Sequence, residues 1–178
     1  MGLGAKRTRS ILFLLQRYSL ACISSSFRYS YICKVKKIVF NQLLTLQLND
    51  TLLSKWLDDC AHYYGVTIQQ LHYSFVSKER MLKLNQTHLD HDTHTDIITF
   101  DYGDCTSISA EIYISSDQCE ENAHTFNVSI ENEILRLISH GFLHCIGYND
   151  KNEEEKNQMR EEENHCIELF HVKHRENV

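Results

Sequence analysis

SIENEILRLISHGFLHCIGYND, residues 129–150, contains the clearest helical pattern in the chain. Its apolar residues recur at the spacing of one helix face: Ile130, Ile134, Leu137, Ile138 and Leu143. Ser129 is suited to cap the start of this helix, and Gly147 is suited to end it. The stretch therefore predicts an amphipathic core helix on which the other elements pack.

Two histidines on this helix indicate a metal site. Residues four apart on a helix lie one above the other, about 5–6 Å apart at Cβ, so His140 and His144 can reach one ion. Gly147 allows the chain to reverse, which lets Asp150 supply an oxygen ligand. Three protein ligands leave a fourth position for water, as in catalytic zinc sites. We predict a single Zn²⁺ held by His140, His144 and Asp150.

Simpler interpretations of these residues remain open. The two histidines could be partly buried helix residues, and Asp150 could be a turn or cap residue. Cys145 lies roughly 100° around the helix from His144, so a small core residue is its simplest role. The acidic runs 153–155 and 161–163 are interpreted as an exposed helix face. Three further histidines either line a cleft or lie in a solvated loop: His88, His91 and His94.

The rest of the chain predicts one α+β domain from residue 37, with a small mixed β-sheet packed against helices. Periodicity and composition predict strands at 37–40, 70–77, 96–102 and 109–115, and helices at 50–65, 78–88, 129–147 and 152–170. Asp50 is expected to cap the first helix and Gly65 to end it. A polar loop is expected at 89–95. No repeat or internal linker divides the domain.

Length and composition agree with a single globular domain. The chain has 178 residues, of which 42% are apolar and 24% are charged. Its seven cysteines are odd in number and form no CxxC pair, which favours reduced thiols in a cytosol or organelle matrix. No apolar run approaches the roughly 20 residues of a membrane-spanning helix.

The charges are unevenly distributed. Residues 1–38 contain eight basic residues and no acidic one, whereas the remainder has 10 basic and 24 acidic residues, a balance of −14. Such an acidic body argues against a protein that holds nucleic acid by bulk electrostatics. The basic segment 1–36 is predicted to be dispensable for the fold, either as an unstructured extension from an early start codon or as an organellar transit peptide. A secretory signal is disfavoured because Arg17 interrupts its apolar run.

The histidine stretch resembles the signature of the YbeY family of metal-dependent endoribonucleases, also called rRNA maturation factors. That signature reads His-Gly-x-Leu-His, two residues, Gly-Tyr-Asp-His. Here the matching residues are His140-Gly141-Phe142-Leu143-His144 and Gly147-Tyr148-Asn149-Asp150. Three other segments are similar to family motifs: THTDIITF (93–100), ISAEIYIS (108–115) and MREEE (159–163). The resemblance covers roughly 38–170, so residues 37–178 are expected to form a YbeY-like domain.

The resemblance implies an activity and its setting. It implies a single-strand-specific, zinc-dependent endoribonuclease that acts in rRNA processing, including 16S rRNA 3′-end maturation, and in ribosome biogenesis. The implied partners are ribosomal RNA and, transiently, the small ribosomal subunit, with no membrane involved. The expected location is the cytoplasm, or an organellar matrix if 1–36 is a transit peptide. No general base is identified from the sequence.

The sequence departs from the family pattern at three positions. The third family histidine is Asp150, which is also a legitimate zinc ligand. Leu89 takes the place of a frequent loop arginine, and Phe100-Asp101 takes the place of a frequent Phe-Pro pair. We interpret these departures as a subgroup variant.

Two other functions are considered. A zinc metallopeptidase also uses HxxxH, but its motif has a glutamate general base after the first histidine, where this chain has Gly141. A non-catalytic ribosome-assembly factor with a structural metal is the other alternative, and the open three-ligand site argues against it.

Overall fold

The computed structural model describes residues 37–42, 48–89, 95–104 and 106–175, all of which belong to one compact unit. The predictions for segment 1–36 and for most of the loop 89–95 lie outside these described residues. Among the described residues, no helix is both long enough and apolar enough to cross a membrane.

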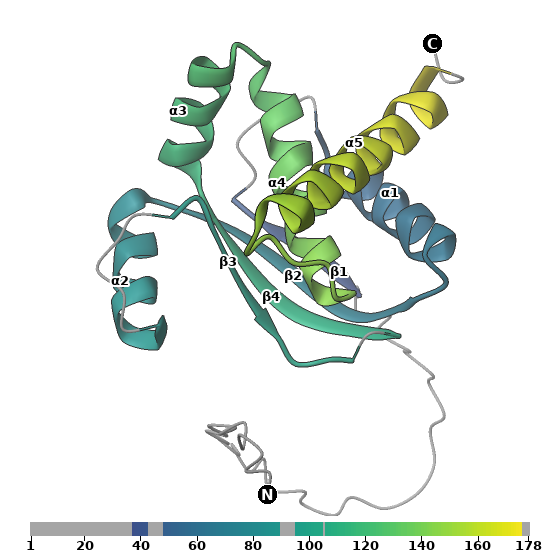
Figure 1. Ribbon diagram of the computed structural model, residues 1–178, viewed down its shortest axis with the longest axis horizontal. Helices are drawn as coiled ribbons and strands as arrows, with labels where there is room; N and C mark the ends of the chain where they lie inside the picture. Colours follow the sequence, from purple (N-terminus) through teal and green to yellow (C-terminus); the bar gives the residue numbers. More distant parts are fainter. Residues whose placement is uncertain (1–36, 43–47, 90–94, 105, 176–178) are drawn as a thin grey trace, which may run out of the picture. The chain divides into compact units, whose positions relative to one another are not determined.

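The described strands form one mixed sheet (Figure 1). They are β1 (Ile38–Asn41), β2 (Thr67–Val76), β3 (Ile97–Asp101) and β4 (Ser107–Ser115). Their order is β1-β2-β4-β3, with β1, β2 and β4 parallel and β3 antiparallel to β4. The predicted small mixed sheet is confirmed, although β2 begins three residues before its predicted start.

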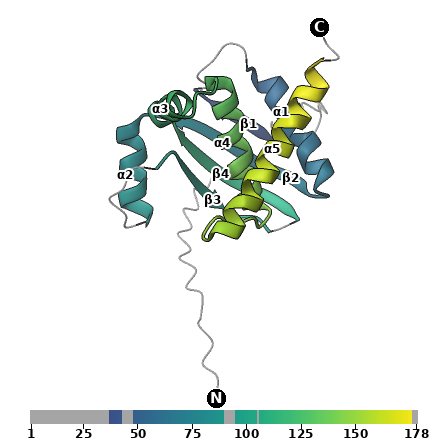
Figure 2. The same cartoon turned by 45° about the horizontal axis from the view of Figure 1, so that its top comes forward.

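Helices cover the two faces of the sheet unequally. The described helices are α1 (Asp50–Tyr63), α2 (Lys78–Leu89), α3 (Ser116–Phe126), α4 (Ile130–Cys145) and α5 (Glu153–Arg175). The main apolar core joins α1, α4 and α5 to the face of β4 that carries Ile112 and Ile114. Tyr113 points to the opposite face, because side chains alternate along a strand, and packs there with residues of α2. Figures 1 and 2 show α2 set apart from the group formed by α1, α4 and α5.

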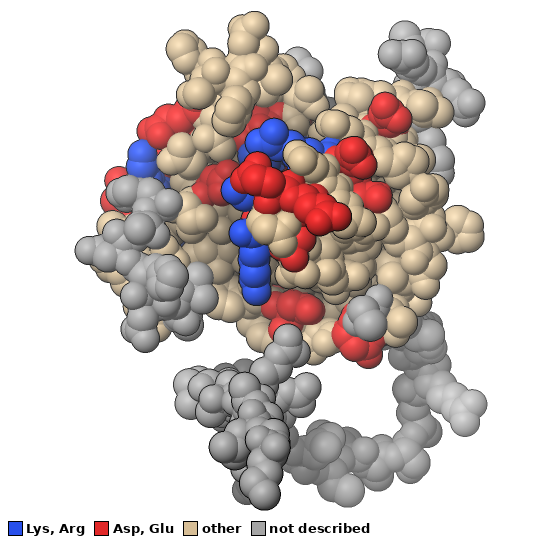
Figure 3. Space-filling view, viewed as in Figure 1, with Lys and Arg blue, Asp and Glu red and all other residues tan. Residues whose placement is uncertain are grey.

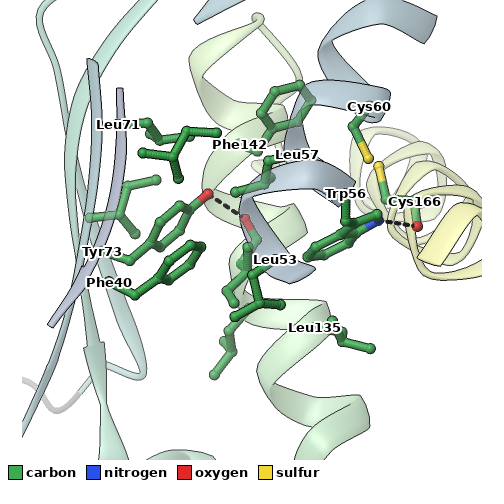
Figure 4. Close-up of a cluster of buried hydrophobic side chains, with 14 of the residues drawn as sticks. Phe40, Leu53, Trp56, Leu57, Cys60, Leu71, Tyr73, Leu135, Phe142 and Cys166 are labelled. Carbon is green, nitrogen blue, oxygen red and sulfur yellow. Dashed lines mark hydrogen bonds between the residues drawn. The ribbon is translucent and has the colours of Figure 1, made fainter. Parts of the chain in front are cut away.

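Hydrogen bonds from buried aromatic residues tie the layers of the core together (Figure 4). The Tyr73 hydroxyl on β2 donates to the Ile138 carbonyl on α4 at 2.9 Å. The Trp56 Nε1 on α1 donates to the Cys166 carbonyl on α5 at 2.7 Å. Both aromatic residues are at most 2% exposed, so each bond satisfies a polar group that burial would otherwise leave unpaired.

The helix ends follow local chemistry, with one correction. The Ser129 hydroxyl accepts from the Asn132 amide at 3.2 Å, so the predicted cap of α4 is confirmed. The prediction that Asp50 caps α1 is wrong, because the Asn49 side chain accepts from the Leu52 amide at 2.9 Å. Asp50 lies instead in the first turn, where a negative charge faces the positive end of the helix dipole.

The sequence patterns did not predict α3. Its N-cap is Ser115, whose hydroxyl accepts from the Gln118 amide, and Cys119 and Ala123 are its buried residues. Two small buried side chains give too little apolar periodicity to reveal a helix of 11 residues. The missed element forms one wall beside the candidate site.

Gly141 allows α4 to lie close to the sheet. A Cβ atom at this position would lie 2.9 Å from Ile112 Cδ1 and 3.2 Å from Ile97 Cδ1. Contacts this short would force the two isoleucine side chains to shift, so the glycine lets α4 lie closer to the sheet than a larger residue would. Position 141 therefore faces the sheet, whereas His140 and His144 lie on another side of the same helix.

Candidate metal centre

One turn of α4 and the loop that follows it bring the three predicted ligands together. The Nε2 atoms of His140 and His144 lie 2.9 Å apart. Gly147, with a φ of 102°, helps reverse the chain, and Asp150 Oδ2 lies 3.8 Å from His140 Nε2 and 4.0 Å from His144 Nε2. A tetrahedral zinc ion with bonds of about 2.1 Å separates neighbouring ligand atoms by roughly 3.4 Å. The separation of the two Nε2 atoms is shorter than that value, and the two separations that involve Asp150 are longer.

Both histidines direct a lone pair towards this point. The Nδ1 of His144 lies 2.9 Å from the Tyr148 carbonyl oxygen, which can only accept, so Nδ1 carries the hydrogen and donates. The Nδ1 of His140 lies 2.6 Å from Glu163 Oε1 and donates to this carboxylate oxygen in the same way. In neutral rings the two Nε2 atoms then face each other with lone pairs and no hydrogen between them. A cation fits this donor set, because each Nε2 lone pair can then bind the ion and the two lone pairs no longer repel each other.

The pKa of His144 also suits a ligand. Burial is the largest cause that lowers this pKa, and the nearby His140 is the second. A lowered pKa keeps the imidazole neutral at pH 7, which is the form that binds metal.

Glu163 is a residue of the site that the sequence patterns wrongly placed on an exposed surface. The run 161–163 was predicted to lie on an exposed helix face, but Glu163 is only 5% exposed. Its carboxylate orients His140, as carboxylates commonly do for metal-binding histidines. The signal that could have found it is its spacing on α5, since it shares a face with the buried residues Met159, Cys166 and Phe170.

A charged network supports Glu163 from α4. Arg136 donates to both Glu133 carboxylate oxygens, at 2.6 and 2.9 Å, and lies 3.4 Å from Asp96 and 4.0 Å from Glu163. Asn122 on α3 donates to Asp96 and Glu133, at 3.1 Å each. Burial alone would lower the pKa of Arg136, but the hydrogen bond and charge of Glu133, followed by the charges of the other two carboxylates, raise it. The guanidinium therefore stays charged and offsets the buried acids.

A cavity of about 860 Å³ lies beside the candidate metal centre. It is lined by residues of α3, α4 and α5, together with two of the three predicted ligands, His140 and Asp150. Its lining includes three cationic side chains and five carboxylates: Arg136, Lys156 and Arg160, and Asp96, Glu133, Asp150, Glu163 and Glu168. Figure 3 shows basic and acidic side chains side by side over the middle of one face. The mixture of charges differs from the continuous positive groove that would follow an RNA backbone.

Other residues considered from the sequence have separate outcomes. Cys145 is 2% exposed, and burial raises the pKa of its thiol to about 12, so its role as a core residue is supported. The side chains of His88 and Leu89, together with His91 and His94, lie outside the described part of the structure. Both interpretations of the three histidines, a cleft lining and a solvated loop, stay predictions.

Comparisons with known proteins agree with the sequence motifs. The family model described as Endoribonuclease YbeY matches residues 37–171. The Endoribonuclease YbeY of Flavobacterium johnsoniae is 39% identical over 124 residues, which are 70% of this chain and 89% of that protein. That of Flavobacterium psychrophilum is 36% identical over 137 residues, covering 76% of this chain and 98% of the relative.

A solved structure shares the fold. It is the solution structure of a Thermotoga maritima protein, with a TM-score of 0.57 and 27% sequence identity, and the match covers 79% of this chain and 93% of that one. The family match extends over most of the chain and includes the segment from His140 to Asp150. This chain belongs to the endoribonuclease YbeY family.

Proposed function

We propose that this protein is a zinc-dependent endoribonuclease that cuts single-stranded RNA during ribosomal RNA processing. The relatives' name, endoribonuclease, supports the reaction class. The observation that carries the metal dependence is the convergence of His140 Nε2, His144 Nε2 and an Asp150 oxygen within 4.8 Å of one another.

In this proposal His140, His144 and Asp150 hold the ion. When bound, zinc supplies a hydroxide nucleophile at neutral pH and a positive charge beside the phosphate that is cut. Glu163 and the Tyr148 carbonyl hold the two imidazole rings in the ligating tautomer. Asp150 is 46% exposed in its side chain, which leaves this side of the site accessible to water and RNA.

The peptidase alternative is disfavoured by packing as well as by sequence. A zinc peptidase of the HExxH type needs a glutamate at position 141 that reaches the metal-bound water. A side chain at this position would instead meet Ile112 and Ile97 on the sheet. The non-catalytic alternative is disfavoured by the open cavity that reaches His140 and Asp150, because a purely structural zinc has four protein ligands and no access for substrate.

The biological setting is proposed on the family resemblance. It includes 16S rRNA 3′-end maturation, transient contact with ribosomal RNA and the small ribosomal subunit, and a cytoplasmic location. The acidic body makes a metal ion important here, because bulk electrostatics would repel RNA.

The test measures RNA and protein cleavage together. The purified protein is expected to cleave single-stranded RNA, to lose this activity in chelator, and to leave casein intact. Asp150→Ala is expected to lose metal and RNA cleavage together, whereas Asp150→His, which keeps three ligands, retains both. Casein digestion that depends on His144, without RNA cleavage under any metal, would support the peptidase instead.

A further inference from the structure

The cavity beside the candidate metal centre has an apolar edge that the metal chemistry does not use. Phe126, the last residue of α3, is 65% exposed, and Val128 is 40% exposed. Both line the same cavity as His140 and Asp150. A single exposed apolar side chain needs no explanation, but two at the edge of a cavity offer a flat surface for a ring.

The cavity also has a polar group that lacks a partner. The Oδ1 of Asn132 on α4 is buried and has no hydrogen-bond partner among the described residues. A buried acceptor left in this state carries a free-energy cost that a donor from a ligand removes. Asn122 differs, because its amide already donates to Asp96 and Glu133 and its oxygen accepts from Gln118. Asn132 therefore has hydrogen-bonding capacity left for a ligand, whereas Asn122 has not.

The charges of the lining select against a phosphate in this cavity. Carboxylates outnumber cationic groups five to three, and Arg136 is already held by Glu133 and Asp96. A phosphate would meet net negative charge here, whereas an uncharged heterocycle would not. A volume of about 860 Å³ is ample for such a ring and falls within the range of small-molecule sites.

We propose that this cavity binds one unpaired nucleobase of the RNA, stacked on Phe126 and hydrogen-bonded at its edge by Asn132. The proposal rests on the proposed function and adds a substrate-binding subsite to it. A base that enters the cavity must leave its own stack and pair, so this subsite would favour single strands over duplexes.

The binding test avoids catalysis by using full-length protein in chelator. Nucleoside 5′-monophosphates are titrated and compared with ribose 5-phosphate, which has the sugar and phosphate but no base. The nucleotides are expected to shift the NMR signals of the Phe126 backbone amide and the Asn132 side-chain amide, and ribose 5-phosphate is expected to leave them unchanged. Phe126→Ala should weaken nucleotide binding by roughly 5- to 100-fold, in line with the loss of one base–aromatic stack.

Two further variants control this comparison. Phe126→Tyr keeps the ring and should bind like the wild type. Tyr63→Ala removes an aromatic side chain that is 58% exposed on α1 and outside the cavity lining, so it should also bind like the wild type. Equal shifts with ribose 5-phosphate, no shifts with any nucleotide, or unchanged binding by Phe126→Ala would each overturn the base subsite.

Cleavage of single-stranded RNA by the wild type separates this inference from the proposed function. If the wild type cleaves RNA but the nucleotides leave Phe126 and Asn132 undisturbed, the base subsite alone is wrong. If the nucleotides bind as expected but no RNA is cleaved with any metal, the proposed function is wrong and the base subsite stands.

Discussion

His140 and His144 lie one turn apart on the same helix, but the groups that orient them come from different parts of the chain. His144 donates to the backbone carbonyl of Tyr148, four residues ahead in the loop after α4. His140 donates to the side chain of Glu163, 23 residues ahead on α5. One half of the site, the local half, is His144 with its acceptor and forms with α4 and its loop. The other half is His140 with Glu163, and it depends on the packing of α5 against α4. This difference predicts that the two halves respond differently to mutation.

The largest effect is expected from removing a ligand of the local half. His144→Ala should reduce the bound zinc from about one ion per chain to almost none and lower RNA cleavage by more than about 100-fold. Unfolding in chelator should change little, because the His144 side chain is 27% exposed and near the helix end. Metal analysis and cleavage assays measure the effect, with His124→Ala, which changes an exposed histidine on α3, as the control. Full metal retention by His144→Ala would remove it from the ligand set.

The half that depends on α5 should give an intermediate effect. Glu163→Ala is expected to weaken zinc binding by roughly 10- to 100-fold, because it removes the acceptor that orients His140. Glu163→Gln should lose less, since its amide oxygen can still accept from Nδ1. Tyr148→Phe should keep wild-type affinity, because the acceptor there is a backbone carbonyl.

Competition with a chelator measures these zinc affinities. The matched control is Glu161→Ala, which removes an exposed carboxylate two residues from Glu163 on the same helix. If Glu161→Ala and Glu163→Ala weaken binding equally, the effect of Glu163 comes from general negative charge and not from the hydrogen bond to His140.

A change on the sheet side of α4 should separate stability from metal binding. Gly141→Ala places a methyl group against Ile112 and Ile97 and is expected to lower the free energy of unfolding by about 1–3 kcal/mol. Zinc stoichiometry of the folded protein should stay unchanged, because the ligands face away from the sheet. Urea unfolding in chelator measures the first quantity, with Gln158→Ala on the exposed face of α5 as the control. A gain of about 1 kcal/mol, which is what alanine gives over glycine in a helix without a clash, would contradict the close approach of α4 to β3 and β4.

The smallest effect is expected from removing residues 1–36. A protein that begins at Lys37 should melt at about the same temperature as the full chain and bind the same amount of zinc, since both halves of the site lie within residues 140–163. A drop of several degrees in the melting temperature would show that the segment stabilises the domain.

Several features could be predicted from the sequence because they depend on neighbours along the chain. The strand β2 buries Leu71, Tyr73 and Phe75 by simple alternation, and α4 buries its apolar stripe by helical periodicity. The cap of α1 was misplaced by one residue, because Asn49 and Asp50 both suit an N-cap and only the backbone conformation distinguishes them. The helix α3 was missed because its two buried side chains are small.

What the sequence by itself determined is the local half of the candidate site. A helix rises 1.5 Å per residue with 3.6 residues per turn, so the spacing from His140 to His144 places both on one side of α4, and Gly147 permits the return of Asp150. Only the tertiary structure decided that Glu163 is buried against His140, and that Phe126 and Asn132 line a cavity beside it. The physical reason is that contacts between helices depend on how whole faces pack, and a glutamate next to two others on α5 looks solvent-exposed until the opposite face is known.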